Sequence, residues 1–141
     1  MMQHLSTRKR AWLPVLSGIL LIVSACATTT SSQEMVEERA MARWEVLLSG
    51  DLPAAYEYLS PGFRSSVSSL QYQRSELRRR VRWTNAKYIE SNCDETACKV
   101  QISLNYTLYG ALPGVKSFEG TQTIEESWVL VNGMWYLVPE K

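Results

Sequence analysis

Histidine is almost absent from this chain, since His4 is the single copy among 141 residues. A serine or cysteine nucleophile that relies on a histidine base therefore has no partner beyond the first few residues. The glycine-rich loops that hold phosphates are also missing. Lysine and arginine (15) nearly balance aspartate and glutamate (14), so the overall charge gives no reason to expect nucleic-acid binding.

The sequence has no apolar run of the roughly 20 residues that an ordinary transmembrane helix needs. The apolar run at 11–25 is interrupted by proline, serine and glycine, and it follows three positive charges at positions 8–10. Basic residues before a short apolar run are typical of a secretory signal. The run ends in Val23-Ser24-Ala25-Cys26, which resembles the lipobox of bacterial lipoproteins.

This resemblance implies that residues 1–25 are a signal peptide cut before Cys26, and that Cys26 then carries diacylglycerol and an acyl chain such as palmitate. The alternative is an ordinary signal with a chance cysteine near its end. Ala27 stands where lipoproteins retained at the inner membrane often have aspartate. We therefore expect an outer-membrane anchor with the domain facing the periplasm, and a Thr/Ser tether over 26–33.

Removal of residues 1–25 changes the composition. Three of the fifteen basic residues leave, which gives twelve basic against fourteen acidic residues and a net charge of −2. His4 leaves as well. Residues 34–141 are the right length for a single small domain.

Cysteine is scarce, and its count indicates a disulfide. If Cys26 carries lipid, Cys93 and Cys98 remain, on either side of a short loop between two strand-like runs. An exported protein lies in an oxidising compartment, so we expect these two to be bonded. Zinc is the alternative, but it normally takes four ligands, and after the loss of residues 1–25 no histidine or further free cysteine remains to supply them. We expect no metal and no other cofactor.

Apolar periodicity predicts helices first and strands afterwards. Helices are expected over 34–49, from Asp51 to a stop at Pro61-Gly62, and from Ser69 into the arginines near 78. Alternation over 99–108 predicts a strand, paired with another over 81–90, and Asn132-Gly133 predicts a tight hairpin. The predicted class is α+β, with N-terminal helices on one face of a curved antiparallel sheet.

Two segments and the order of elements resemble a known superfamily. "RAMARWEVLLSGDLPAAYEYLSP", then strands ending in "EESWVLVNGMWYLVP", are similar to nuclear transport factor two-like (SnoaL-like, cystatin-like) domains, in which helices form a cone against a bent sheet. The superfamily includes isomerases and dehydratases, transport and assembly factors, and envelope proteins. Its enzymes usually use an Asp–His or similar pair, which this chain does not match, so function depends on the site itself.

The candidate acid or base is Glu126. Unbroken alternation would place it on the same face as Ile124 and Trp128, where with Tyr106 it would form a polar point in an apolar pocket. We favour the other arrangement, because adjacent carboxylates such as Glu125 and Glu126 are commonly solvated. In it a β-bulge shifts the register, and Glu126 lies at the open rim or on the outer face.

A run of arginines is the other conspicuous feature. Cations near a helix C-terminus stabilise the helix, and this effect alone is enough to explain why arginines occur there. They also form a candidate surface for anionic lipid or an acidic partner. The residues are Arg74, Arg78, Arg79, Arg80 and Arg82.

The sequence therefore predicts a non-enzymatic, membrane-anchored envelope domain that binds a partner protein or a small apolar ligand, with a homodimer left open. The alternative is a small isomerase or dehydratase that uses a carboxylate and a tyrosine in the cone pocket. Nucleic acid is not an expected partner.

Overall fold

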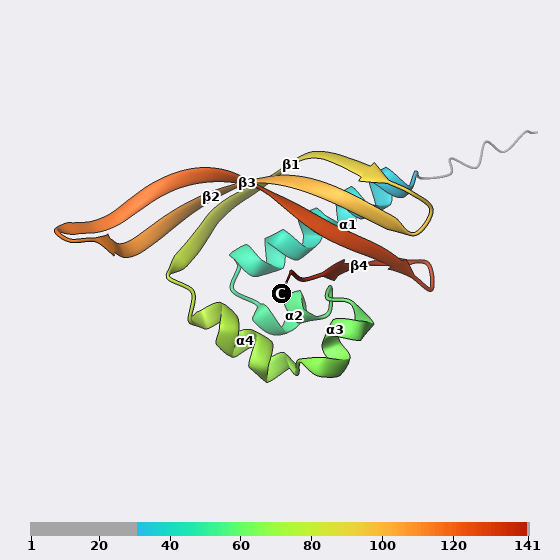
Figure 1. Cartoon of the computed structure of the whole chain (residues 1–141), viewed down its shortest axis with the longest axis horizontal. Helices are drawn as coiled ribbons and strands as arrows, with labels where there is room; N and C mark the ends of the chain where they lie inside the picture. Colours follow the sequence, from blue (N-terminus) through green and yellow to red (C-terminus); the bar gives the residue numbers. More distant parts are fainter. Residues whose placement is uncertain (1–30, 141) are drawn as a thin grey trace, which may run out of the picture.

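The structure, a computed structural model, describes residues 31–140, with only the backbone at 111 and 112. Within this range four helices precede four strands (Figure 1). They are α1 (Ser32–Leu48), α2 (Leu52–Tyr56), α3 (Pro61–Ser66), α4 (Ser69–Leu77), β1 (Val81–Cys93), β2 (Ala97–Leu112), β3 (Val115–Val131) and β4 (Met134–Val138). The predicted α+β class is confirmed. Among the described residues, no helix is both long and apolar enough to cross a membrane.

A capping box starts α1. The Ser31 hydroxyl accepts a hydrogen bond from the Glu34 N–H at 3.2 Å, and the Glu34 carboxylate accepts one from the Ser31 N–H at 2.8 Å. These contacts satisfy backbone donors that the first turn leaves free. Val36, Ala40 and Trp44 are buried along one side of the helix, which confirms the predicted amphipathic α1.

The proline at 61 has a different role from the predicted one. α2 already ends at Tyr56, and Pro61 begins α3 with Ser60 as its N-cap. Proline suits this place because the first helical N–H has no intrahelical partner. Leu59, expected on the second helix, instead forms a parallel bridge with Leu137. α4 ends at Leu77, so Arg79 and Arg80 lie in the link to β1.

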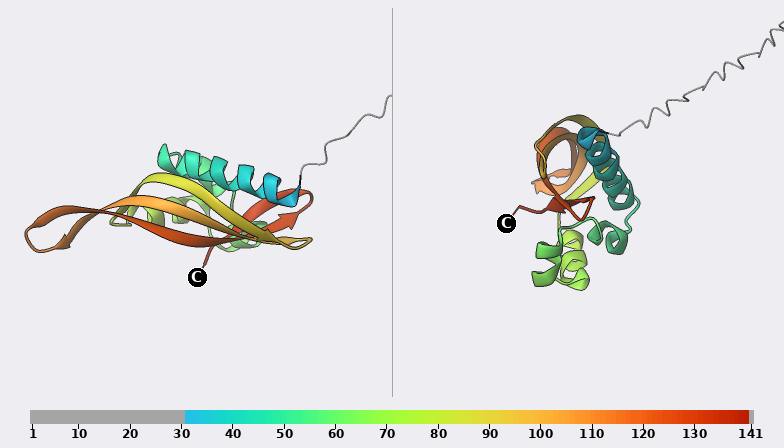
Figure 2. Two further views of the ribbon diagram at one scale, coloured as in Figure 1. Left: turned by 90° about the horizontal axis from the view of Figure 1, so that it is seen from above. Right: turned by 90° about the vertical axis from the view of Figure 1, so that its right-hand side faces the viewer.

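The sheet is antiparallel in the order β1-β2-β3-β4. The turn between β3 and β4 contains Asn132 at φ 51° and Gly133 at φ 79°. Positive φ at both positions is the geometry of the predicted tight hairpin, which is confirmed. β1 contains two register shifts, which bend a strand, and the sheet is visibly twisted (Figure 2). The β2–β3 hairpin projects beyond the helices (Figure 1).

The core lies between α1 and one face of the sheet (Figure 2). Val100, Ile102 and Leu104 are fully buried, and they alternate with exposed or half-exposed residues as predicted for β2. Trp128 is fully buried on the same face. Near the start of β2, beside Trp128, Cys93 and Cys98 form a disulfide between directly paired strand positions, which confirms the expected bond.

Candidate functional site

Glu126 lies inside the domain, and the expectation that it sits at the rim or on the outer face is wrong. Its side chain is 6% exposed, whereas its neighbour Glu125 is exposed and pairs with Lys99 at 3.1 Å. The predicted bulge is absent here, because β2 and β3 pair without a shift from Ala97 as far as Tyr109. Continuous register keeps strict alternation, so successive glutamates face opposite sides of the sheet.

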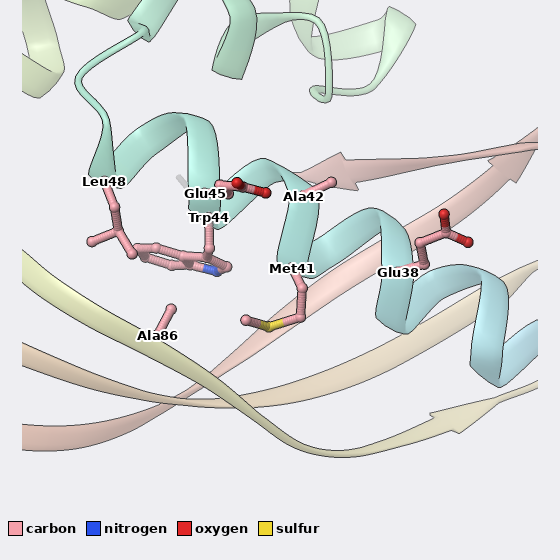
Figure 3. Close-up of a pocket in the computed structure, with 7 residues that line it drawn as sticks. All are labelled: Glu38, Met41, Ala42, Trp44, Glu45, Leu48 and Ala86. Carbon is pink, nitrogen blue, oxygen red and sulfur yellow. The ribbon is translucent and has the colours of Figure 1, made fainter.

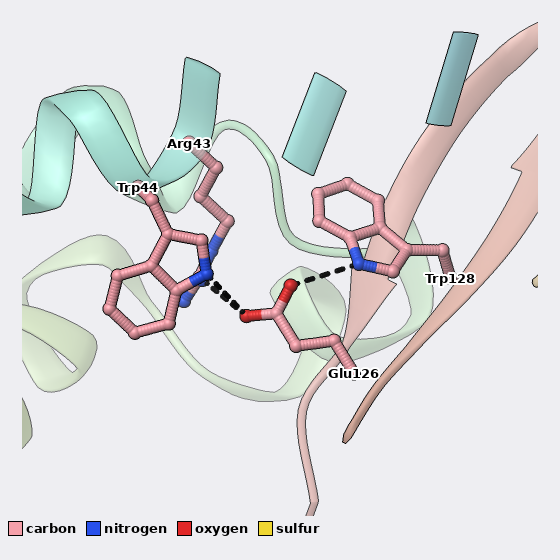
Figure 4. A network of polar contacts seen from close by, with 4 residues as sticks. All are labelled: Arg43, Trp44, Glu126 and Trp128. Carbon is pink, nitrogen blue, oxygen red and sulfur yellow. Dashed lines mark hydrogen bonds and ion pairs between the residues drawn. The ribbon is translucent and has the colours of Figure 1, made fainter. Parts of the chain in front are cut away.

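Three donors converge on the Glu126 carboxylate (Figure 4). Oε1 accepts hydrogen bonds from Arg43 Nη1 and from Trp44 Nε1, both at 3.0 Å. Oε2 accepts one from Trp128 Nε1, also at 3.0 Å. Burial raises the pKa of the Glu126 carboxyl above its ordinary value, while the Arg43 charge and the indole donors of Trp128 and Trp44 act in the opposite sense.

Arg43 is the member of this network that sequence reasoning missed. It lies beside Trp44 on α1 and is only 7% exposed. The signal was an arginine bordering the apolar side of a helix, between Ala40 and Leu47. Arginine at such a place usually reaches solvent, and its partner here is 83 positions along the chain, so local patterns do not reveal it.

Tyr106 and Glu126 are not brought together. Glu126 pairs with Val100, and Tyr106 follows Val100 by six residues along β2. At about 3.3 Å per residue the two side chains start about 20 Å apart. Tyr106 instead contacts the Trp83 ring edge-on at 6.1 Å between centroids and covers Gly120. The prediction that Glu126 and Tyr106 share one pocket is therefore wrong.

A different tyrosine borders the same cavity as Glu126. Tyr72, on α4, is 5% exposed, and its hydroxyl has no hydrogen-bond partner among the described residues. Burial raises the pKa of Tyr72, and the charge of Arg43 opposes this. The sequence gave no indication that the Tyr72 hydroxyl would lie in a cavity, because a tyrosine on the apolar side of a helix is usually part of the hydrophobic core.

The cavity holds about 590 Å³ and lies between α1, α4, the α4–β1 link, β3 and the chain after β4. Glu126, Arg43 and Tyr72 are part of its lining, and a majority of its other lining residues are apolar or aromatic. Arg79 and Arg80 also border it, whereas Arg74, Arg78 and Arg82 do not. The apolar and aromatic lining residues are Trp44, Leu47, Leu59, Val81, Trp83, Ile124, Leu137, Val138 and Pro139.

A second hollow of about 570 Å³ lies between α1 and β1 (Figure 3). It is lined by Glu38, Met41, Ala42, Trp44, Glu45, Leu48 and Ala86. Its lining combines apolar side chains with two carboxylates from a single helix, and it contains no paired donor and acceptor that would orient a substrate. The first cavity is the stronger candidate site.

The five predicted arginines are all exposed near the end of α4 and the start of β1. One of them, Arg79, pairs with Glu76 at 3.0 Å. Within residues 31–140 no three histidine, cysteine, aspartate or glutamate side chains gather as metal ligands would. Cys26 and the other lipobox residues lie outside the described part.

Comparison with known proteins gives a fold relationship. No family model matches the sequence, and no curated protein does. Among solved structures, the chain is similar to the solution structure of a SEC-C motif containing protein from Rhodopseudomonas palustris. The TM-score is 0.58 at 12% identity, over 74% of this chain and 76% of that one. Likeness at this identity concerns the fold alone.

Proposed function

We propose that this chain is a periplasmic lipoprotein, anchored in the bacterial outer membrane through Cys26, whose domain binds a partner and has no catalytic role. The observation that carries the binding role is the cavity of about 590 Å³ beside Glu126. Clefts of roughly 300–1,000 Å³ with apolar walls and a few polar groups are typical of ligand sites.

The contacts of Glu126 favour binding over catalysis. A general base needs a free lone pair that can reach the substrate proton. Here protein donors take three of the roughly four acceptor sites of the carboxylate, and one donor is a charged guanidinium, so the carboxylate is held mainly by protein contacts. Proton transfer to Glu126 would weaken the buried pair with Arg43, so the network suits a structural support for the cavity floor.

We also propose that the domain is a nuclear transport factor two-like cone. The order of helices before strands, the bent sheet and the cavity between α4 and that sheet support this assignment. The assignment makes the α+β description more specific. It does not indicate a function, because one fold can carry many functions and the function depends on the residues of the site.

One observation favours a second candidate, a small isomerase or dehydratase. Tyr72 has a buried hydroxyl without a partner among the described residues, and it borders the same cavity as Glu126. In that case Tyr72, rather than Tyr106, would act with the carboxylate. Tyr72→Phe would then abolish turnover and leave the three hydrogen bonds to the Glu126 carboxylate in place, whereas a binding domain would keep its ligand.

The test of the binding role is native mass spectrometry of the full-length protein after gentle release from membranes. We expect a reproducible added mass, or a co-purified partner, that decreases in a Gln122→Trp variant because Gln122 borders the cavity. A bare protein mass, together with no uptake of 1-anilinonaphthalene-8-sulfonate, an anionic dye whose aromatic body fluoresces in apolar sites, would remove the case for a binding cavity.

The anchor is tested separately. Cys26→Ser should leave the precursor uncut and prevent metabolic labelling with a palmitate analogue. A matched Cys93→Ser/Cys98→Ser variant should still be labelled. A Cys26→Ser product of mature size that stays membrane-bound would contradict the proposed lipid anchor.

A further inference from the structure

The third strand of the sheet is much longer than the strand that covers its outer edge. β3 runs over Val115–Val131, but β4 pairs only with residues 127–131. β4 ends at Val138, and the next residue is Pro139, which has no N–H to continue a ladder. On this side no other described segment pairs with residues 115–126. Backbone groups along this edge are therefore available to another strand.

This edge has few of the features that normally prevent strand addition. Proteins protect exposed edges with proline, lysine, bulges or a covering segment. Residues 117–126 contain no proline and no lysine, and β3 follows β2 without a bulge over this length. The charges on the open edge are Lys116 at its start, Glu119, Glu125 and the inward-pointing Glu126, so most of residues 117–124 carry no charge. Side chains along it are mostly exposed, including Phe118 at 51%.

The cavity opens beside this same edge. Gln122, Ile124 and Glu126, which alternate along β3 and share the core face, all line it. The opposite wall is formed by the α4–β1 link and by the residues that follow β4. A strand laid against β3 would therefore direct alternate side chains toward the cavity.

Resting on the proposed binding role, we infer that the partner is an extended polypeptide segment that pairs antiparallel with residues 117–126 of β3 and inserts one large apolar side chain into the cavity. Strand addition of this kind obtains affinity from main-chain hydrogen bonds and specificity from pockets for alternate side chains. A compact apolar molecule would fill the cavity but leave the row of edge backbone groups without a partner.

The first probe is a display library of random ten-residue peptides, selected against the full-length protein in detergent and counter-selected against the Gln122→Trp variant. We expect enriched sequences with a large apolar residue within alternating β-forming residues. Methylation of backbone nitrogens at alternate positions of an enriched peptide should lower its affinity at least tenfold, because each blocked donor loses a ladder hydrogen bond.

Proline substitution of the edge provides matched variants. Along a strand, successive N–H groups point to opposite neighbours, so one of Thr121 and Gln122 donates toward β2 and the other toward the open edge. Each is replaced by proline in turn. The variant whose thermal stability is retained identifies the outward position, and we expect that variant to bind the peptide about tenfold more weakly. Arg74→Glu, outside the cavity, should bind as the wild type does.

The outcomes separate this inference from the binding role. If the naphthalene dye enters the cavity but no peptide is enriched, or if an enriched peptide binds equally well after N-methylation, strand addition is wrong and the binding role stands. If neither dye nor peptide binds, both are wrong. A concentration-dependent dimer that the outward proline abolishes would assign the edge to a second copy of the chain and overturn the inference.

Discussion

At the scale of single residues, the buried charges of Glu126 and Arg43 depend on each other. Removing one member of a buried ion pair leaves an uncompensated charge, at a cost of about 3–5 kcal/mol. We expect Glu126→Gln to lose stability in this range, measured by chemical denaturation. The exposed pair of Lys99 and Glu125 is the control, and Glu125→Gln should cost only about 0–1 kcal/mol.

A double variant shows whether charge is the cause. Arg43→Met with Glu126→Gln removes both charges and keeps one amide oxygen, which can accept from one of the two indole N–H groups, since Trp44 and Trp128 donate to different oxygens of Glu126. It should recover part of the stability lost by Glu126→Gln alone. If the double variant is as unstable as the sum of its single changes, the contact is not an interdependent pair.

Asp94 gives a prediction of pH dependence. Its carboxylate accepts hydrogen bonds from the N–H groups of Thr96 at 2.8 Å and Ala97 at 2.7 Å, which lower the pKa of Asp94 below its usual 3.8. A carboxyl with a lowered folded pKa stabilises the fold above its unfolded pKa and loses that contribution as pH falls through the folded value. The stability advantage of wild type over Asp94→Asn should therefore be constant above about pH 5 and shrink as pH falls below about 4.

Denaturation curves across this pH range provide the measurement, and an NMR titration of the Asp94 carboxyl provides the pKa itself. Glu95→Gln is the matched control, because Glu95 accepts neither of these two hydrogen bonds. An advantage that grows as the solution is made more acidic would contradict the assignment.

The sequence revealed part of this site. Period-two alternation does place Glu126 on the core face with Trp128, and that simple reading was correct. The expectation of a solvated pair failed because it depended on the average behaviour of adjacent glutamates. Glu126 can be buried because Arg43, on a helix far away in the sequence, pairs with it. Local sequence patterns do not reveal a contact between residues 83 positions apart.

At the scale of elements, Gly120 shows how β3 accommodates β2. A Cβ atom placed on Gly120 would lie 2.6 Å from the Cζ and Oη atoms of Tyr106. Gly120→Ala must therefore displace the Tyr106 ring, and overpacking of this kind typically costs about 1–3 kcal/mol. We expect a loss near the lower end, because Tyr106 is half-exposed and can rotate away.

The steric cause is tested by a second background. In a Tyr106→Ala variant, the additional Gly120→Ala change should cost little, because the clashing ring is gone. Gly62 in α3 is the control: an added Cβ meets nothing within 4 Å there, so Gly62→Ala should be neutral or stabilising by less than about 1 kcal/mol. An equal loss in both backgrounds would mean that strand flexibility, rather than the ring, sets the preference for glycine.

Elements with strong local signals were predictable, and those governed by tertiary contacts were not. The capped, amphipathic α1 and the Asn132-Gly133 turn are fixed by short-range chemistry. Pro61 was misassigned because proline is compatible both with ending one helix and with starting another, and the local sequence does not distinguish these. The two register shifts of β1 against β2, which bend a strand, have no clear sequence signature.

At the scale of the whole molecule, charge is divided between two ends. Glu34 and Glu38 lie near the start of α1, and this end is joined to the acidic β1–β2 turn by a hydrogen bond from Gln33 Nε2 to the Ser91 carbonyl at 3.3 Å. The α4–β1 link with its arginines lies toward the other end of α1 (Figure 1). The helix alone spans about 25 Å.

This division constrains the arginine surface if Cys26 is the anchor. Cys26 precedes Ser31 by five residues, which reach at most about 18 Å. Anionic headgroups attract charges only within roughly a Debye length, about 8 Å at physiological salt. If the start of α1 is held near the bilayer and the helix points away from it, the arginines lie about three such lengths from the headgroups. They are then available to a partner in the periplasm rather than to the membrane that carries the anchor.

Fluorescence quenching measures this orientation directly. The full-length lipoprotein in vesicles is labelled at one introduced cysteine, either Glu34→Cys or Arg78→Cys, both exposed positions. Headgroup-labelled quencher lipid should quench the label at position 34 strongly and the label at 78 near background, with little change when salt is raised. Stronger quenching at 78 that weakens with salt would place the arginine surface against the bilayer, because screening acts on charges that depend on nearby headgroups.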